Sequence, residues 1–99
     1  MKLKNLFENF NLSFHQRYIL LQTKLAATPR LAFEQINRNE SDIKSRQILQ
    51  SIGHINANEE DASASLTPQG EQAIIEYGLV DETGSPTEVG NEILQSHNA

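Results

Sequence analysis

The sequence contains one short arrangement of residues twice, and this repeat restricts the folds open to the chain more than any other feature. The first copy is "LTPQGEQAI" at residues 66–74 and the second is "PTEVGNEIL" at residues 86–94. Each copy has a threonine, two residues, a glycine, two residues and an apolar pair. A threonine hydroxyl accepts hydrogen bonds from the unpaired backbone N–H groups in the first turn of a helix. Both copies therefore predict the start of a helix.

Each copy is preceded by another glycine, Gly53 in "IGHIN" and Gly78 in "YGLVD". Glycine adopts the left-handed conformation that ends many helices. Each copy thus predicts a helix end, a loop and a helix start, with a loop five residues shorter in the second copy. Gly70 and Gly90 fall near the third position of the following helix, where glycine costs about 1 kcal/mol relative to alanine. We expect both to allow close approach to a neighbouring backbone.

Hydrophobic periodicity and capping residues predict a mainly α-helical chain with one small β-hairpin. Helices are expected over residues 1–10, 14–27, 29–37, 41–52, 68–77 and 87–94, and the hairpin over residues 54–66. The expected N-caps of the second, third and fourth helices are Ser13, Thr28 and Ser41. This order, a tri-helical core followed by a β wing, predicts a winged helix-turn-helix with about six helices.

The length of 99 residues predicts a single domain. It divides into N-terminal helices over 1–28, a winged-helix core over 29–77, and a C-terminal turn and helix over 78–99. The apolar positions also predict which helix faces are buried. In the second helix the buried face is expected to comprise Phe14, Tyr18, Leu21 and Leu25, widened by Ile19, Leu20 and Ala26. In the fourth helix it is expected to comprise Ile43, Ile48, Leu49 and Ile52.

The composition excludes several kinds of protein. The chain has no cysteine, which excludes disulfides, thiolate metal sites and cysteine nucleophiles. No apolar run approaches the roughly 18 residues that span a bilayer, and the N-terminus is too polar for a signal peptide. We therefore expect a cytoplasmic protein with no membrane partner.

The net charge of −5 hides a division between the two halves of the chain. Residues 1–46 hold all eight Lys and Arg residues and four acidic ones, a charge of +4. Residues 47–99 hold nine acidic residues and no Lys or Arg, a charge of −9. Such asymmetry indicates a partner selected by charge. The alternative is that solubility alone requires the charge and its distribution has no function.

The stretch "LQSIGHINANEEDASASLTPQGEQAI" resembles winged-helix proteins of the MarR-like kind. Those proteins commonly have a recognition helix ending in Leu-x-x-x-Gly, a β wing, and Leu-Thr-Pro-x-Gly leading into the next helix. Here these are Leu49, Gly53, the hairpin over 54–66 and the run from Leu66 to Gly70. The resemblance implies DNA binding and a homodimer formed through terminal helices. The whole chain also resembles small uncharacterised proteins of large tailed bacteriophages, which implies a location in the host cytoplasm but no activity.

If the resemblance to MarR-like proteins extends to function, the helix over 41–52 reads the major groove of duplex DNA. The expected DNA contacts are Arg30, Arg38, Ser41, Lys44, Ser45, Arg46 and Gln47. The arginines are expected on phosphates, while Gln pairs with adenine edges and Lys with guanine. The leading interpretation is a small DNA-binding protein, such as a phage regulator of transcription. The alternative without a binding role is that Lys44 and Arg46 belong to the solvated face of a surface helix.

Two features favour a different partner. The wing tip carries Glu59, Glu60 and Asp61, which phosphates would repel, and the whole C-terminal half is acidic where DNA-binding domains are normally basic. The second interpretation is therefore a protein–protein interaction module of the same fold. Its acidic wing and C-terminal lobe would dock onto a basic surface of a host or phage protein. A third interpretation is a virion assembly component.

No motif for catalysis stands out. The three histidines, His15, His54 and His97, are scattered, and the acidic run at the wing tip lacks the alternating ligands of an EF-hand. Neither copy of the repeat matches a phosphate-binding fingerprint. We predict that the protein is not an enzyme and has no cofactor or metal.

Overall fold

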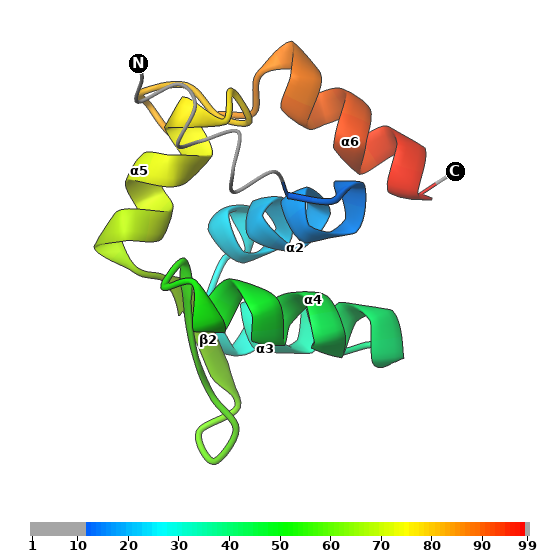
Figure 1. Ribbon diagram of the computed structural model, residues 1–99, viewed down its shortest axis with the longest axis vertical. Coiled ribbons are helices and arrows are strands. Elements are labelled where there is room, and N and C mark those ends of the chain that lie inside the picture. The colour runs from blue at the N-terminus through cyan, green and yellow to red at the C-terminus, as the bar shows by residue number, and fades with distance from the viewer. Residues whose placement is uncertain (1–11, 99) are drawn as a thin grey trace.

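The computed structural model describes residues 12–98, which form five helices and one β-hairpin (Figure 1). The elements are α2 (Phe14–Leu25), α3 (Pro29–Gln35), α4 (Glu40–Ser51), β1 (Ile55–Asn58), β2 (Ser63–Leu66), α5 (Pro68–Glu76) and α6 (Glu88–Asn98). The prediction of a mainly helical fold with a small hairpin is confirmed. The helix predicted over residues 1–10 lies outside the described residues.

Helix α2 begins where the sequence predicts it, because Ser13 and Gln16 form a capping box. The Ser13 hydroxyl accepts a hydrogen bond from the backbone N–H of Gln16 at 3.1 Å. The side-chain oxygen of Gln16 in turn accepts one from the backbone N–H of Ser13 at 2.9 Å. Two otherwise unpaired donors at the helix start are satisfied in this way.

The buried part of α2 agrees with the prediction in the middle of the helix and differs from it at the two ends. Residues 18–21 are all buried, while Phe14 and Leu25 are 48% and 40% exposed. The physical reason is position: α2 lies at the centre of the molecule, with α6 on one side and α3 and α4 on the other (Figure 1). Its middle is therefore covered on more than one face, and its two ends are left partly uncovered.

Helix α4 corrects two details of the prediction. Its N-cap is Asn39, whose side-chain oxygen accepts a hydrogen bond from the backbone N–H of Asp42 at 2.8 Å. Ser41 lies inside the first turn and is not the cap. The buried face is also rotated from the predicted one: its members are Asp42, Ser45, Arg46 and Leu49, and Ile48 is 44% exposed. Three of these four side chains are polar, so a search for apolar periodicity could not find the face.

The predicted hairpin is confirmed. Strands β1 and β2 pair antiparallel, with Ile55 opposite Leu66 and Ala57 opposite Ala64. Ile55 and Ala64 point into the core, while the intervening pair Asn56 and Ser65 is exposed, as the two-residue period of a strand requires. The hairpin packs against α3 through β2 and extends beyond the helices (Figure 1).

The first copy of the repeat forms a compact junction between the hairpin and α5. The Thr67 hydroxyl accepts from the backbone N–H of Gly70 at 2.9 Å and donates to the carbonyl oxygen of Gly53. The backbone N–H of Thr67 donates to the carbonyl oxygen of His54 at 3.1 Å. Gly53 has a φ of +83°, as a left-handed helix stop requires.

The second copy repeats this junction almost atom for atom. The Thr87 hydroxyl accepts from the backbone N–H of Gly90 at 3.1 Å and donates to the carbonyl oxygen of Gly78, which has a φ of +76°. The backbone N–H of Thr87 donates to the carbonyl oxygen of Leu79 at 3.0 Å. A single β-bridge between Val80 and Pro86 takes the place of the hairpin.

The close approach predicted for the two helix-start glycines is confirmed. A Cβ atom on Gly70 would overlap the carbonyl oxygen of His54, and one on Gly90 would overlap that of Leu79. The second junction turns the chain so that α6 packs back on α2. Ile93 of α6 is buried in the common core with Leu79 and Val80. Among residues 12–98, no helix has the length and apolar character needed to cross a membrane.

Candidate functional site

The predicted DNA contacts lie on α4, at the start of α3 and in the turn between them, and the structure divides them into two groups. Five of the predicted contacts are exposed: Arg30, Arg38, Ser41, Lys44 and Gln47. Ile48 and Ser51 continue the same exposed face toward the end of α4. Ser45 and Arg46 are buried. Their predicted role in contacting DNA is therefore corrected, since neither side chain lies on the surface.

Arg46 is 4% exposed and connects three elements of the fold. Its guanidinium donates to the side-chain oxygen of Asn37 at 2.7 Å and to that of Gln50 at 2.7 Å. A longer contact of 3.5 Å reaches the carboxylate of Glu59 at the hairpin tip. Because its donors are directed at these partners, Arg46 holds the α3–α4 turn, α4 and the hairpin together.

The predicted wing-tip residues Glu59, Glu60 and Asp61 are all exposed. The side-chain oxygen of Asn58 accepts from the backbone N–H groups of Glu60 and Asp61 at 2.9 and 3.2 Å and so shapes the turn. The tip therefore presents three carboxylates to solvent, of which only Glu59 approaches a guanidinium within the described part of the chain.

The charges of the α3, α4 and hairpin surface sum to a negative value. Between residues 29 and 61 the exposed ionisable side chains are three cations and five carboxylates: Arg30, Arg38, Lys44, Glu34, Glu40, Glu59, Glu60 and Asp61. Duplex DNA is bound through the neutralisation of several phosphates by Lys and Arg. With Arg46 buried, this surface carries less positive charge than the sequence led us to expect.

The C-terminal lobe, residues 67–98, extends this negative surface. All nine acidic residues of the second half of the chain are exposed, from Glu59 at the hairpin tip to Glu92 on α6. On α5 a shallow groove of about 470 Å³ surrounds Ile75, which is 41% exposed, and Glu71, Glu76 and Glu82 line its sides. This gives an apolar centre with a carboxylate rim, which we call the Ile75 groove.

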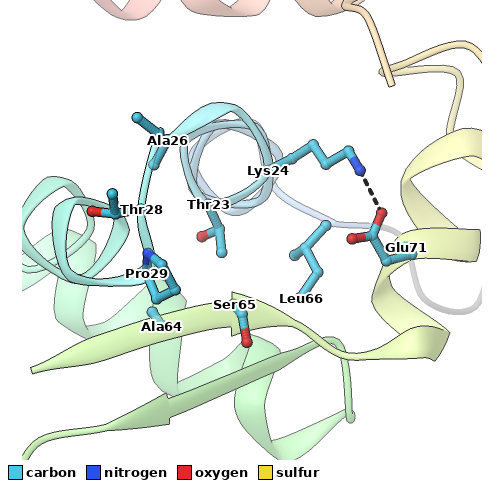
Figure 2. A pocket seen from close by; sticks show the side chains of 10 residues that line it. Thr23, Lys24, Ala26, Thr28, Pro29, Ala64, Ser65, Leu66 and Glu71 are labelled. Atoms are coloured by element: carbon cyan, nitrogen blue, oxygen red, sulfur yellow. Dashed lines mark hydrogen bonds and ion pairs between the residues drawn. The ribbon is translucent and has the colours of Figure 1, made fainter. Parts of the chain in front are cut away.

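A smaller pocket of about 180 Å³ lies between the end of α2, the start of α3, and β2 (Figure 2). Lys24 and Glu71 face each other across its edge, with Nζ and Oε1 2.7 Å apart. Small-molecule sites usually occupy about 300–1,000 Å³. The pocket is below that range, and its lysine is already paired with a carboxylate.

A further groove of about 420 Å³ lies beside the first junction, where His54 meets Tyr77. The His54 Nε2 and the Tyr77 hydroxyl are 2.9 Å apart, and the buried His54 Nδ1 has no hydrogen-bond partner among the described residues. Burial lowers the pKa of His54 and raises that of Tyr77. Both groups are therefore neutral at pH 7, and the pair supplies a polar contact without charge.

The fold also brings together two of the three histidines that the sequence leaves scattered. His15 Nε2 lies 2.7 Å from Asp42 Oδ1, and His15 Nδ1 lies 3.3 Å from His97 Nε2. His15 and His97 are 82 residues apart and Asp42 belongs to a third helix. No local spacing links these residues, which explains why sequence reasoning missed the cluster.

Comparisons of the chain with protein-family models, with curated proteins and with solved structures found no match.

Proposed function

We propose that the protein is a non-enzymatic interaction module that docks its acidic hairpin tip and C-terminal lobe onto a basic surface of another protein. The observation that carries this proposal is that all nine acidic residues of the second half of the chain are exposed, in a half that contains no Lys or Arg. Such a surface attracts a basic partner and accelerates its association. It equally repels nucleic acid.

The Ile75 groove supplies the apolar contact that charge alone cannot. Protein interfaces typically have a desolvated apolar centre within a polar rim. Ile75 is a 41% exposed aliphatic side chain, and Glu71, Glu76 and Glu82 surround it. The matching partner surface is an apolar side chain flanked by Lys or Arg. Glu71 is already paired with Lys24, so Glu76 and Glu82 are the carboxylates proposed to meet the partner.

A second candidate function is duplex DNA binding through α4, and one observation favours it. Ser41, Lys44 and Gln47 are exposed on one outward face of α4, with Arg38 at its start. These are side chains that hydrogen-bond base edges and phosphates in a winged-helix arrangement. The resemblance to MarR-like proteins supports this candidate, whereas the excess of carboxylates on the same surface opposes it.

One set of variants separates the two candidates. Wild type and the triple variant Ile75→Ser, Glu76→Gln, Glu82→Gln are used to capture proteins from a lysate of the source cell, and a captured partner is then purified and titrated directly. The matched control is Val89→Ser, Glu88→Gln, Glu92→Gln, which makes the same kinds of change at exposed positions of α6. The proposal predicts that the α5 variant loses the partner, and that the α6 variant, which removes two carboxylates of the same lobe but leaves the Ile75 groove intact, binds more weakly without losing it. It also predicts that affinity falls with salt.

The DNA candidate is tested by fluorescence anisotropy on random duplex at about 50 mM salt, where phosphate contacts are strong. Binding by wild type that disappears in Lys44→Glu would replace the protein-docking proposal with the DNA-binding one. A partner that binds the α5 variant as tightly as wild type would contradict the role of the Ile75 groove.

A further inference from the structure

Three helix ends meet on one side of the molecule: the first turns of α2 and α4 and the last turn of α6 (Figure 1). They carry His15, Asp42 and His97 respectively. We propose that His15 and His97 together bind one divalent transition-metal ion, such as Zn²⁺, and that Asp42 holds His15 in the binding orientation. This inference does not depend on the function proposed above, because none of its three residues belongs to the proposed docking surface.

The spacing of the two nitrogens fits a metal site. Zn²⁺ binds histidine nitrogens at about 2.0–2.1 Å in tetrahedral geometry, which places two such ligands about 3.3–3.4 Å apart. His15 Nδ1 and His97 Nε2 are 3.3 Å apart. The imidazole rings are inclined at 51° with their centroids 4.9 Å apart, so the rings do not stack on each other. One ion can therefore take both nitrogens without a large movement of either helix.

Asp42 determines which nitrogen of His15 is free. Its Oδ1 lies 2.7 Å from His15 Nε2, and its Oδ2 accepts from the backbone N–H of Arg38 at 3.2 Å. A buried carboxylate next to Nε2 keeps the proton on that nitrogen, so the lone pair is on Nδ1, the nitrogen that faces His97. A carboxylate that orients a metal-binding histidine through its other nitrogen is a common feature of protein metal sites.

His97 is held in place by Tyr18, whose ring stacks on the imidazole with centroids 3.5 Å apart and planes 7° apart. The side chain of His15 is 26% exposed, so water can reach the site and complete the coordination. Imidazole nitrogens suit Zn²⁺, Cu²⁺ and Ni²⁺.

The test is calorimetric titration of tag-free protein with Zn²⁺ alone at pH 7.5. The expected result is one ion per chain, with binding abolished in His97→Gln, which removes a ligand at an end of the chain but keeps a polar side chain. The matched control is His54→Gln, a histidine outside the cluster, which should bind as wild type does. Asp42→Asn should bind about 10- to 100-fold more weakly, as for other residues that orient metal ligands.

A second measurement does not depend on the folding of any variant. Nitrogen-15 NMR of the wild-type imidazoles should show Zn²⁺-induced shifts at His15 Nδ1 and His97 Nε2, with His54 unchanged. Failure of wild type to bind Zn²⁺ at 1:1, or equal binding by His97→Gln, would overturn the proposal. The His15–His97 contact would then be a hydrogen bond that only joins α2 to α6.

Discussion

At the scale of single residues, the two glycines at the helix starts show how one missing side chain decides a packing distance. Gly70 and Gly90 each lie in the first turn of a helix, where their backbone N–H donates to the capping threonine. Each also lies against the carbonyl oxygen of the residue that follows a left-handed glycine. Glycine lowers helix propensity by about 1 kcal/mol relative to alanine. Any other residue would place its Cβ atom on that carbonyl oxygen.

We predict that Gly70→Ala and Gly90→Ala each lower the free energy of unfolding by about 1–3 kcal/mol, as for other overpacked sites. The sign is informative, because alanine raises helix propensity and would stabilise an unobstructed helix. Chemical denaturation monitored by circular dichroism measures the effect. Gln72→Ala and Asn91→Ala, at exposed positions of the same helices, should change the free energy by no more than about 0.5 kcal/mol. An increase in stability in either glycine variant would contradict the close-contact interpretation.

At the scale of elements, Arg46 ties α4 to the turn before it and to the hairpin after it. It is buried on a face with Asp42, Ser45 and Leu49, and its guanidinium bonds to Asn37 and Gln50 while approaching Glu59. The hairpin is therefore oriented by a side chain of α4 as well as by packing on α3. This is also why the electrostatic surface differs from the one expected from sequence: one of the cations of this region is used within the fold.

We predict that Arg46→Ala lowers the free energy of unfolding by about 1.5–3 kcal/mol, because hydrogen bonds to a charged donor are lost and their acceptors stay partly buried. Lys44→Ala, an exposed position two residues earlier, should change it by less than about 0.5 kcal/mol. Thermal or urea denaturation of both variants gives the comparison. Equal stability of the two variants would show that the Arg46 contacts make no net contribution to the free energy of unfolding.

At the scale of the whole molecule, the second junction reverses the chain so that α6 packs against α2. It directs α6 back across α2, buries Ile93 in the core, and places His97 beside His15 and Tyr18. The acidic residues of α5, the 81–86 turn and α6 thereby share one lobe and remain exposed. The same chain reversal thus completes the core with Ile93 and leaves the acidic residues of this lobe on the surface.

We predict that Ile93→Ala destabilises the protein by about 2–5 kcal/mol, the usual cost of removing a large buried aliphatic side chain. Val89→Ala on the same helix is the control, because Val89 is 50% exposed and its truncation leaves no cavity. Denaturation curves of the two variants test the packing of α6 against the core. A small effect of Ile93→Ala would mean that α6 contributes little to the stability of the domain.

The sequence by itself determined the features that depend on neighbouring residues. Caps at Ser13, Thr28, Thr67 and Thr87, stops at Gly53 and Gly78, and the hairpin between them are local, since each involves hydrogen bonds or backbone angles within a short segment. The repeated junction could be predicted from the sequence for the same reason. The exposed acidic half followed from composition, because unpaired carboxylates remain in water.

Only the tertiary structure decided which faces are buried and which distant residues meet. Arg46 is held by the turn before α4 and by the hairpin after it, and no periodicity of apolar residues encodes a polar buried face. The meeting of His15, Asp42 and His97 depends on three helices that are separated along the chain. Contacts of this kind are set by the packing of whole elements, so their chemistry becomes visible only when the chain is folded.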